Sequence, residues 1–309
     1  VIDNLLTAVK KVLAEDHMDI PIMVVKGDGS LMNEKIALER PIETILSGPA
    51  ASIIGATYLN DVSDGLIVDM GGTTTDIAMV KNGVPVKVDG GIRIGNWHTF
   101  VKGLYIDTFG LGGDSAVRYK GPDLILDTKR VIPLCIAAAD HPEIVPYLRR
   151  LHREGARHSR FLHEFLLLMR EPGEDNSYEP VERELCAVLR NGPLPLEEAA
   201  RAMDRDVYQL RTDRLEEEGV IMRAGLTPTD IMHIRGDFSQ YSTEAARLGA
   251  DFVSRAMGTT TERLCKRVYN EVEYRMFSNL ARILLEDQNP WYKEHGLGEG
   301  LELQLRTLW

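Results

Sequence analysis

Asp69-Met70-Gly71-Gly72-Thr73-Thr74-Thr75-Asp76 places two glycines and three threonines between two aspartates. The apolar runs Leu66–Val68 and Ile77–Val80 lie on either side, and their length and composition predict strands. Asn82-Gly83 predicts a second tight turn, because a type I′ turn needs positive φ at both central residues. Since Val84, Val86 and Val88 alternate with other residues after it, the sequence predicts a three-stranded β-meander over residues 65–88.

The predicted first turn has the composition of a nucleotide-phosphate site. Glycines let backbone N–H groups approach a phosphate closely, threonine hydroxyls add donors, and a carboxylate at each end can hold Mg²⁺. The alternative is a tight hairpin whose threonines only favour strands, but the paired aspartates and the strand-turn-strand context favour the phosphate site. There is no GxxxxGK[ST] motif, and no helix follows the turn as a dinucleotide-binding fold requires. The candidate residues are Asp69, Gly71, Gly72, Thr73, Thr74, Thr75 and Asp76.

The segments before this hairpin predict further helices and strands. Residues 2–16 carry apolar side chains at spacings of three and four, which is typical of one face of a helix. Ile22–Val25 predicts a buried strand that runs into the glycine-rich turn of residues 26–30. At Ser47-Gly48-Pro49 a turn leads into a predicted helix, with Pro49 in its first turn.

The segments after the hairpin are predicted to be mainly helical. A second glycine cluster, residues 110–115, precedes a predicted strand, and from about residue 120 charged amphipathic helices are expected. Residues 181–223 read as three helices followed by a short strand, an order that resembles a winged helix. A long C-terminal helix has an apolar residue at every fourth position from Leu264 to Leu284 and ends near Asn289-Pro290. We therefore predict an α/β core at 1–120, a helical insertion at 121–225 and a C-terminal helical part of the core at 226–309.

Composition excludes several classes of protein. The 309 residues include 36 Lys+Arg and 47 Asp+Glu, and a formal net charge of -11 disfavours binding to nucleic acids and to anionic membrane surfaces. The longest apolar runs are shorter than the roughly 20 residues that cross a bilayer. The three cysteines, Cys135, Cys186 and Cys265, form no CxxC pair, so neither a disulfide framework nor a structural zinc site is indicated and a cytoplasmic location is expected.

Three motifs in order resemble the hydantoinase/oxoprolinase family: KGDGSLM (residues 26–32), RPIETILSGPAASIIGA (40–56) and DMGGTTTDIA (69–78). The resemblance covers residues 1 to about 118 and returns at residues 226–250, with none at 121–225. It implies the fold of the sugar kinase, heat-shock chaperone and actin superfamily, in which two ribonuclease-H-like domains each contribute a phosphate hairpin. Only the second hairpin is present here, so the resemblance implies an excised domain that does not turn over ATP alone.

By the same resemblance, the activity is ATP-dependent opening of a cyclic amide such as a hydantoin or 5-oxoproline, with ATP and Mg²⁺ as cofactors. Asp69 would position the metal or water, residues 71–75 would hold phosphate, and Asp76 would be a second metal or metal-water ligand. Gly112 and Gly113 align with a glycine-rich segment of the family, although Asp114 departs from its pattern, and a structural turn is the equal alternative. A separate hydrolytic subunit is an expected partner, and a homo-oligomer stays open.

A second hypothesis is a regulatory protein of the same fold that senses nucleotides and carries a winged-helix module. Residues 181–223 hold seven Arg and no Lys against ten Asp and Glu. A helix that reads DNA should be basic, whereas the candidate recognition helix contains Arg211 and Arg214 beside Asp213 and residues 216–218, all glutamates. The sequence therefore favours a packing or partner-docking role for this segment.

The histidines His152, His158 and His163 are expected on one helix, but their spacings of six and five do not place them on one face as metal ligands. Five arginines lie between positions 149 and 160, so a solvated basic face is predicted for this segment.

Overall fold

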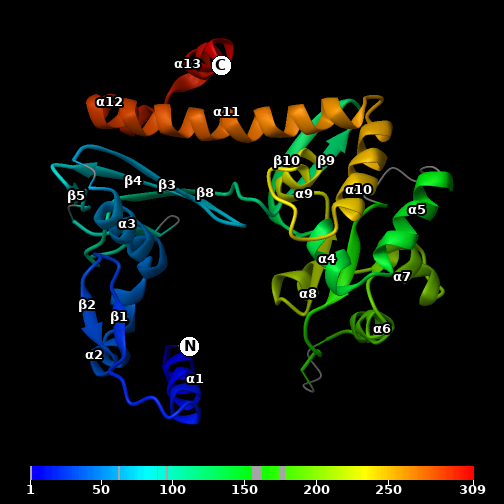
Figure 1. Cartoon of the computed structure of the whole chain (residues 1–309), viewed down its shortest axis with the longest axis horizontal. Helices are drawn as coiled ribbons and strands as arrows, with labels where there is room; N and C mark the ends of the chain where they lie inside the picture. Colours follow the sequence, from blue (N-terminus) through cyan, green and yellow to red (C-terminus); the bar gives the residue numbers. More distant parts are fainter. Residues whose placement is uncertain (1, 62, 89, 95–96, 155–161, 174–177) are drawn as a thin grey trace. The chain divides into compact units, whose positions relative to one another are not determined.

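The computed structural model describes residues 2–61, 63–88, 90–94, 97–154, 162–173 and 178–309, and its architecture is mixed α/β (Figure 1). The chain forms two compact units, residues 1–109 and residues 110–309. The first unit ends at Phe109, whereas the division at residues 120 and 225 that the sequence indicates stays a prediction. Among the described residues, we find no helix whose length and hydrophobicity would suffice to span a lipid bilayer.

The N-terminal part of the first unit confirms the predicted helices and strand, except that the strand, predicted to be buried, is only half-buried and leaves Met23 exposed. The helix over residues 2–15 buries Leu6, and the antiparallel pair that follows encloses the glycine-rich turn of residues 26–30. The next long helix begins at Ser47, at the predicted turn-to-helix junction. These elements are α1 (Ile2–Glu15), β1 (Met23–Val25), β2 (Leu31–Asn33), α2 (Glu34–Glu39), the 3-10 helix η1 (Pro41–Thr44) and α3 (Ser47–Asn60).

The central sheet of the first unit confirms the predicted hairpin and corrects the third strand. Asn82 and Gly83 both have positive φ, as the type I′ turn requires. The strand after this turn ends at Pro85, because another strand takes the rest of the same edge of the central strand. The strands are β3 (Gly65–Met70), β4 (Thr75–Lys81), β5 (Val84–Pro85) and β8 (Ile106–Phe109), and β6 (Arg93–Ile94) pairs separately with β7 (Trp97–His98).

The second unit contains more strands than the sequence predicts. The segment after residue 120, expected to be helical, continues as a hairpin and contributes strands to a four-stranded mixed sheet of order β11-β14-β12-β13. Its strands are β9 (Ser115–Lys120), β10 (Asp123–Arg130), β11 (Ile132–Pro133), β12 (Phe165–Leu168), β13 (Leu194–Pro195) and β14 (Ile221–Gly225). The helices are α4 (Leu134–Asp140), α5 (Ile144–Glu154), α6 (Pro180–Leu189), α7 (Leu196–Ala202), η2 (Val207–Gln209), α8 (Asp213–Glu217), α9 (Pro228–Arg235), α10 (Thr243–Ala256), α11 (Thr261–Gln288), α12 (Pro290–His295) and α13 (Gly298–Leu308).

The long C-terminal helix α11 has the predicted length and end. Asn289 caps it at the C-terminus, and Pro290 begins α12. Leu264 and Val268 are buried, whereas Leu284 is exposed. An apolar residue at every fourth position drifts around a helix of 3.6 residues per turn, so only part of this stripe faces the core of the unit.

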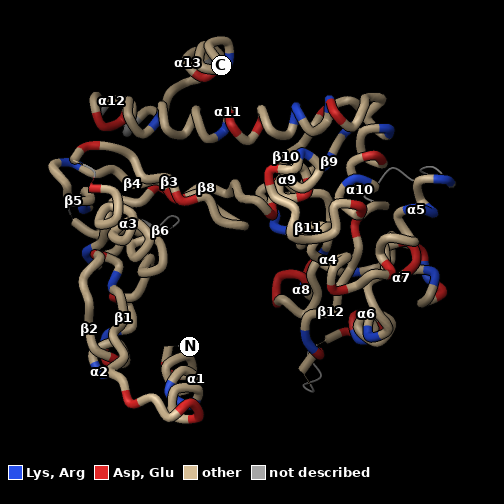
Figure 2. Tube along the Cα trace, in the orientation of Figure 1, with Lys and Arg blue, Asp and Glu red and all other residues tan. Residues whose placement is uncertain are grey.

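Charged residues of both signs are interspersed along the two units (Figure 2). Many of them form ion pairs between elements of the second unit, such as Arg150 with Glu198 at 3.1 Å and Arg205 with Glu184 at 2.9 Å. Many arginines thus have a carboxylate partner within the second unit, and the chain as a whole carries a net charge of -11.

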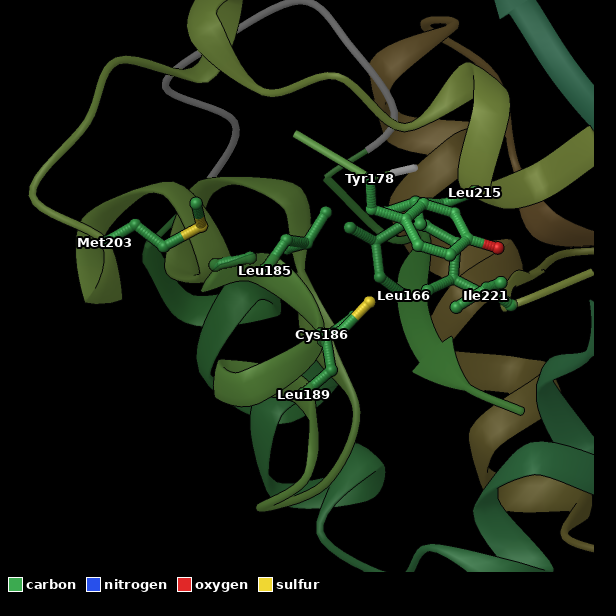
Figure 3. Packing of buried hydrophobic residues seen from close by; sticks show 10 residues of the cluster. Leu166, Tyr178, Leu185, Cys186, Leu189, Met203, Leu215 and Ile221 are labelled. Atoms are coloured by element: carbon green, nitrogen blue, oxygen red, sulfur yellow. The ribbon is translucent and has the colours of Figure 1, made fainter. Parts of the chain in front are cut away.

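A hydrophobic cluster connects α6, α7 and α8 to the sheet (Figure 3). Leu185 and Cys186 of α6 and Leu215 of α8 are buried against Leu166 of β12 and Ile221 of β14. The order α6, α7, α8 and β14 agrees with the predicted order of elements, while the winged-helix interpretation itself stays a prediction.

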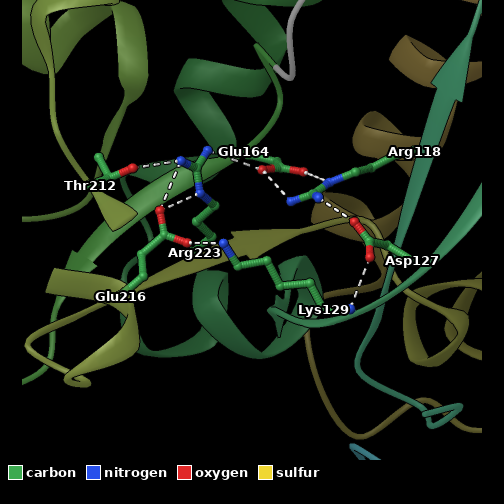
Figure 4. A network of polar contacts seen from close by, with 7 residues as sticks. All are labelled: Arg118, Asp127, Lys129, Glu164, Thr212, Glu216 and Arg223. Atoms are coloured by element: carbon green, nitrogen blue, oxygen red, sulfur yellow. Dashed lines mark hydrogen bonds and ion pairs between the residues drawn. The ribbon is translucent and has the colours of Figure 1, made fainter. Parts of the chain in front are cut away.

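A network of charges lies between the β9-β10 hairpin and this sheet, and it is largely buried except at Lys129 (Figure 4). Arg118 of β9 donates to Glu164, just before β12, at 2.9 Å, and Glu164 also pairs with Arg223 of β14 at 3.4 Å. Glu216 of α8 accepts from Arg223 and pairs with Lys129, both at 2.9 Å. Because removal of one member would leave a buried charge without its partner, the network favours one arrangement of hairpin and sheet.

The predicted solvated face of histidines is wrong for His163. His152 lies in α5 and His158 lies outside the described residues, but His163 precedes β12 and is 0% exposed. Helix α5 ends at Glu154. His163 lies directly before β12, an inner strand of its sheet, and its side chain is therefore buried. Within the described part of the chain, neither ring nitrogen of His163 has a hydrogen-bond partner.

Burial lowers the pKa of the His163 imidazole from 6.5 to about 4, with Glu164 opposing and Arg118 reinforcing the effect. The unfolded chain therefore binds a proton that the folded chain excludes, and the free energy of unfolding should fall as the pH drops from 6.5 toward 4. A tenfold change in proton affinity corresponds to about 1.4 kcal/mol, so the loss should reach up to about 3 kcal/mol.

The measurement is urea unfolding followed by far-UV circular dichroism between pH 7 and 4.5, for the wild type and His163→Phe. We expect the substitution to flatten the pH dependence, and the exposed His98→Gln to leave it unchanged. An equally steep dependence in His163→Phe would rule out this histidine as its source.

Candidate phosphate-binding hairpin

The hairpin between β3 and β4 places the two predicted aspartates directly opposite each other. Asp69 pairs with Asp76, and Met70 pairs with Thr75, so the turn consists of residues 71–74. The turn is closed by the Gly71 N–H, which donates to the Thr74 carbonyl at 2.9 Å. Since directly opposed residues of an antiparallel pair share one face of the sheet, both carboxylates belong to the same face.

A third polar residue extends this pair. Thr108 of β8 pairs with Asp76 on the other edge of β4, and its hydroxyl donates to Asp76 Oδ1 at 2.5 Å. Asp76 is only 9% exposed, so this hydrogen bond fixes one carboxylate oxygen of a nearly buried side chain. We call Asp69, Asp76 and Thr108 the polar row. Thr108 is not recognisable as a site residue from the sequence, because no spacing rule connects positions 76 and 108 before the strand order is known.

The polar row is supported by an apolar row on the same face of the sheet. Ile67, Ala78 and Ile106 are paired across the three strands two residues farther from the turn, and Ala50 and Ile53 of α3 pack on them. Exposure then increases toward the turn: Thr75 is buried, Thr74 is half-buried, and residues 71–73 are exposed. The hairpin thus presents an open glycine-threonine turn on a rigid, packed base.

Gly71 is not required by the fold of the chain itself. Its φ lies outside the left-handed region, and an added Cβ would meet only the Thr74 carbonyl oxygen at 3.6 Å, an ordinary contact. The described chain therefore leaves space at this position, as the close approach of a phosphate to the turn requires.

Two carboxylates suit Mg²⁺, which needs few protein ligands, better than a metal ion whose ligands all come from protein side chains. Among the described residues, no group of three or more His, Cys, Asp or Glu side chains is arranged to hold a metal ion. Mg²⁺ usually keeps several waters and is bound by one or two carboxylates together with substrate phosphates. Asp69 and Asp76 offer two carboxylates on one face of the sheet, and their predicted role in holding Mg²⁺ stays a prediction.

The glycines of the earlier turn, residues 26–30, are required by the local fold. A Cβ at Gly27 would lie 2.3 Å from the Ile45 carbonyl oxygen, and Gly29 has a φ of +79°. Asp28 accepts hydrogen bonds from the N–H and hydroxyl of Ser30, and Lys26 pairs with Glu43 at 2.7 Å. These contacts account for the motif as turn chemistry.

Gly112 and Gly113 belong to the second unit, where their contacts are also internal. The Gly112 N–H donates to Ser115 Oγ at 3.0 Å, and the Gly113 carbonyl accepts from the N–H and hydroxyl of Thr229. A Cβ at Gly113 would lie 2.7 Å from Thr229 Oγ1, which gives this glycine a packing reason. Their predicted role in cofactor binding stays a prediction.

Cys135, His233 and Asp230 lie close together in the second unit, but their hydrogen bonds exclude a nucleophile and its base. His233 Nδ1 lies 2.8 Å from the Thr229 carbonyl, and its Nε2 accepts from the Tyr241 N–H. A carbonyl oxygen only accepts, so Nδ1 carries the proton and cannot take one from the Cys135 thiol at 3.7 Å. Burial and the nearby Asp230 raise the pKa of that thiol, which makes it inert.

The N-terminal part of the chain matches a known protein family. Residues 1–129 match the family model described as hydantoinase/oxoprolinase. A 66-residue segment is 38% identical to the uncharacterized protein MJ0964 of Methanocaldococcus jannaschii, covering 20% of this chain and 10% of that protein.

The chain also resembles a nucleotide-free structure of acetone carboxylase, an enzyme of ATP-dependent acetone carboxylation. The TM-score is 0.52 at 14% sequence identity, over 92% of this chain and 30% of that one. At this identity the likeness concerns the fold alone, and it agrees with the mixed α/β architecture. The chain spans less than a third of the length of either relative.

Proposed function

We propose that this chain, whose residues 1–129 form a hydantoinase/oxoprolinase family domain, supplies the second phosphate hairpin of an ATP-dependent enzyme that opens a cyclic amide. The observation that carries the proposal is the pairing of Asp69 with Asp76 across an exposed turn in which Gly71 leaves space that the fold itself does not need. The ribonuclease-H-like character of the first unit is part of the same proposal.

The residues divide into two roles. The N–H groups and hydroxyls of residues 71–75 would hold phosphate oxygens, and Asp69 and Asp76 would hold Mg²⁺ through one or two carboxylate oxygens. Thr108 keeps Asp76 in one orientation, because its hydroxyl occupies Oδ1. Phosphoryl transfer depends mostly on positioning and electrostatic stabilisation, so a rigid base beneath the turn is what this chemistry needs.

When bound, Mg·ATP would supply a phosphoryl group to the amide oxygen, which makes the ring carbon open to attack by water. Amide resonance otherwise makes this carbon unreactive, which is why opening of a hydantoin or 5-oxoproline, in which water adds to the carbon, the C–N bond breaks and the nitrogen takes up a proton, would be coupled to ATP. Hydrolysis on a separate subunit remains part of the proposal. Carboxylation of a ketone, the ATP-dependent reaction of the structural neighbour, is the second candidate for the coupled reaction.

The regulatory alternative has less support. The side chains of the predicted recognition helix are engaged within the protein: Arg211 pairs with Glu179 at 3.2 Å, and Arg214 pairs with Glu218 at 2.8 Å. Acidic residues dominate the trace around α8 (Figure 2). Since phosphate backbones are bound by available cations, these observations favour a packing role for α8.

The test is isothermal titration of the chain with Mg·ADP and Mg·ATP, for the wild type and Gly71→Ala. An added methyl group meets no close contact inside the protein, so the variant should fold normally but bind at least about tenfold more weakly, because the methyl occupies the approach of a phosphate. Gly55→Ala, where an added Cβ meets nothing within 4 Å, is the matched control.

Undiminished binding by Gly71→Ala would contradict the assignment of the turn. If the wild-type chain binds neither nucleotide, the same two variants are compared in the intact enzyme, where unchanged ATP-dependent turnover by Gly71→Ala would contradict the assignment.

A further inference from the structure

A groove of about 570 Å³ lies in the second unit between α9, α10 and the N-terminal half of α11. These three helices pack against one another (Figure 1). Residues 262, 265, 266, 269, 270 and 273 of α11 line one side, at the spacing of a single helix face. The volume is within the range of pockets that hold small organic ligands.

Cations from all three helices line this groove. Arg235 comes from α9, Arg247 from α10 and Lys266 from α11, while the acidic Glu262 and Glu273 lie toward its two ends along α11. The lining therefore carries three cations and two carboxylates, whereas the whole chain has a net charge of -11.

Two of these cations are available to a ligand. Among the described residues, Arg247 and Lys266 have no carboxylate within ion-pair distance, although Arg247 is near enough to contribute to the lowered pKa of Glu262. Arg235 is held in place, because its guanidinium lies 3.8 Å from the centre of the Tyr269 ring and pairs with Asp237 at 2.9 Å. One fixed and two available cations make a site for an anionic oxygen group.

The remaining lining of the groove is mixed, with the polar Thr261 and Asn270 beside apolar surface. Cys265 is 5% exposed and forms part of its floor, and Ile234 and Tyr269 add apolar surface. Burial raises the pKa of the Cys265 thiol, so this residue is neutral and contributes shape only.

We propose that this groove binds a small organic anion that carries a phosphate or carboxylate group on an apolar body. The anionic group would contact Arg247 and Lys266, and the apolar body would cover Cys265 and Ile234. This site uses residues separate from the β3-β4 hairpin, so it stands independently of the proposed function.

The test is isothermal titration of the 309-residue chain with phenyl phosphate, benzoate and inorganic phosphate. We expect saturable binding of phenyl phosphate or benzoate that is tighter than that of inorganic phosphate, because only the organic probes bury apolar surface. Preference for phenyl phosphate would assign the anionic group as a phosphate, and preference for benzoate as a carboxylate. Arg247→Ala and Lys266→Ala should each weaken binding by about tenfold.

Arg263→Ala is the matched control, since it removes the same charge from an exposed position of α11 outside the groove and should change affinity less than about twofold. Gly71→Ala should also leave the affinity unchanged, which separates this site from the hairpin. Absence of saturable binding of both organic probes to the wild type would overturn the proposal. An equal loss in Arg263→Ala, Arg247→Ala and Lys266→Ala would overturn it as well, because it would show attraction to the surface as a whole.

Discussion

Asp69→Ala is expected to lower the ATP-dependent turnover of the intact enzyme by about 10³-fold or more while leaving the fold unchanged. Asp69 is half-buried at the end of β3, directly opposite Asp76, on the face that leads to the open turn. Its removal would take away a carboxylate that positions metal or water, whereas the apolar row beneath it would stay packed.

Steady-state turnover with saturating Mg·ATP is the measurement, with circular dichroism to confirm the fold. Asp69→Asn keeps the size of the side chain and removes its charge, so it should lose nearly as much activity as alanine if the charge is what acts. Asp19→Ala, at an exposed position before β1, is the control and should be unchanged. Wild-type turnover in Asp69→Ala would contradict the role assigned to the hairpin.

The hairpin could be predicted from the sequence because its information is local. Glycine, threonine and Asn-Gly carry turn and strand preferences that neighbouring residues do not override, and the observed register places Asp69 opposite Asp76 as a hairpin of this length must. Thr108 could not be predicted in the same way. Its partner is 32 positions away, and the pairing of β8 with β4 depends on the whole intervening chain.

The errors in the second unit have a related physical cause. Residues 123–130 contain four charged side chains, which weakens any alternating pattern, and they become a strand because β9 pairs with them. His163 was expected on a solvated face because arginines precede it along the chain. Instead, Glu164 pairs with Arg118 and Arg223, two residues that lie 46 and 59 positions away. The periodicity of apolar residues cannot predict such a network, because each charged member has the residue type that is typical of a surface position.

The same reasoning applies to Asp230, a charged residue that is 0% exposed. Its carboxylate accepts from the N–H groups of Leu134 and Cys135 at 3.1 and 2.8 Å, and from the N–H and hydroxyl of Thr227 at 2.9 and 3.0 Å. It therefore caps the N-termini of α4 and α9 together. Negative charge at a helix N-terminus is favourable, and here one side chain serves two helices.

Asp230→Ala should destabilise the second unit by about 3–5 kcal/mol, because the N–H groups of Leu134, Cys135 and Thr227 would be left buried without acceptors. Asp230→Asn should lose less stability than Asp230→Ala, because its amide oxygen still accepts hydrogen bonds. It should remain less stable than the wild type, because its NH₂ group would face N–H donors. Urea unfolding followed by circular dichroism gives the free energies. The matched control is Asp237→Ala, which removes a surface ion pair with Arg235 and should cost about 1 kcal/mol or less. If Asp230→Ala unfolds at the same urea concentration as Asp237→Ala, the four hydrogen bonds do not hold the two helices as described.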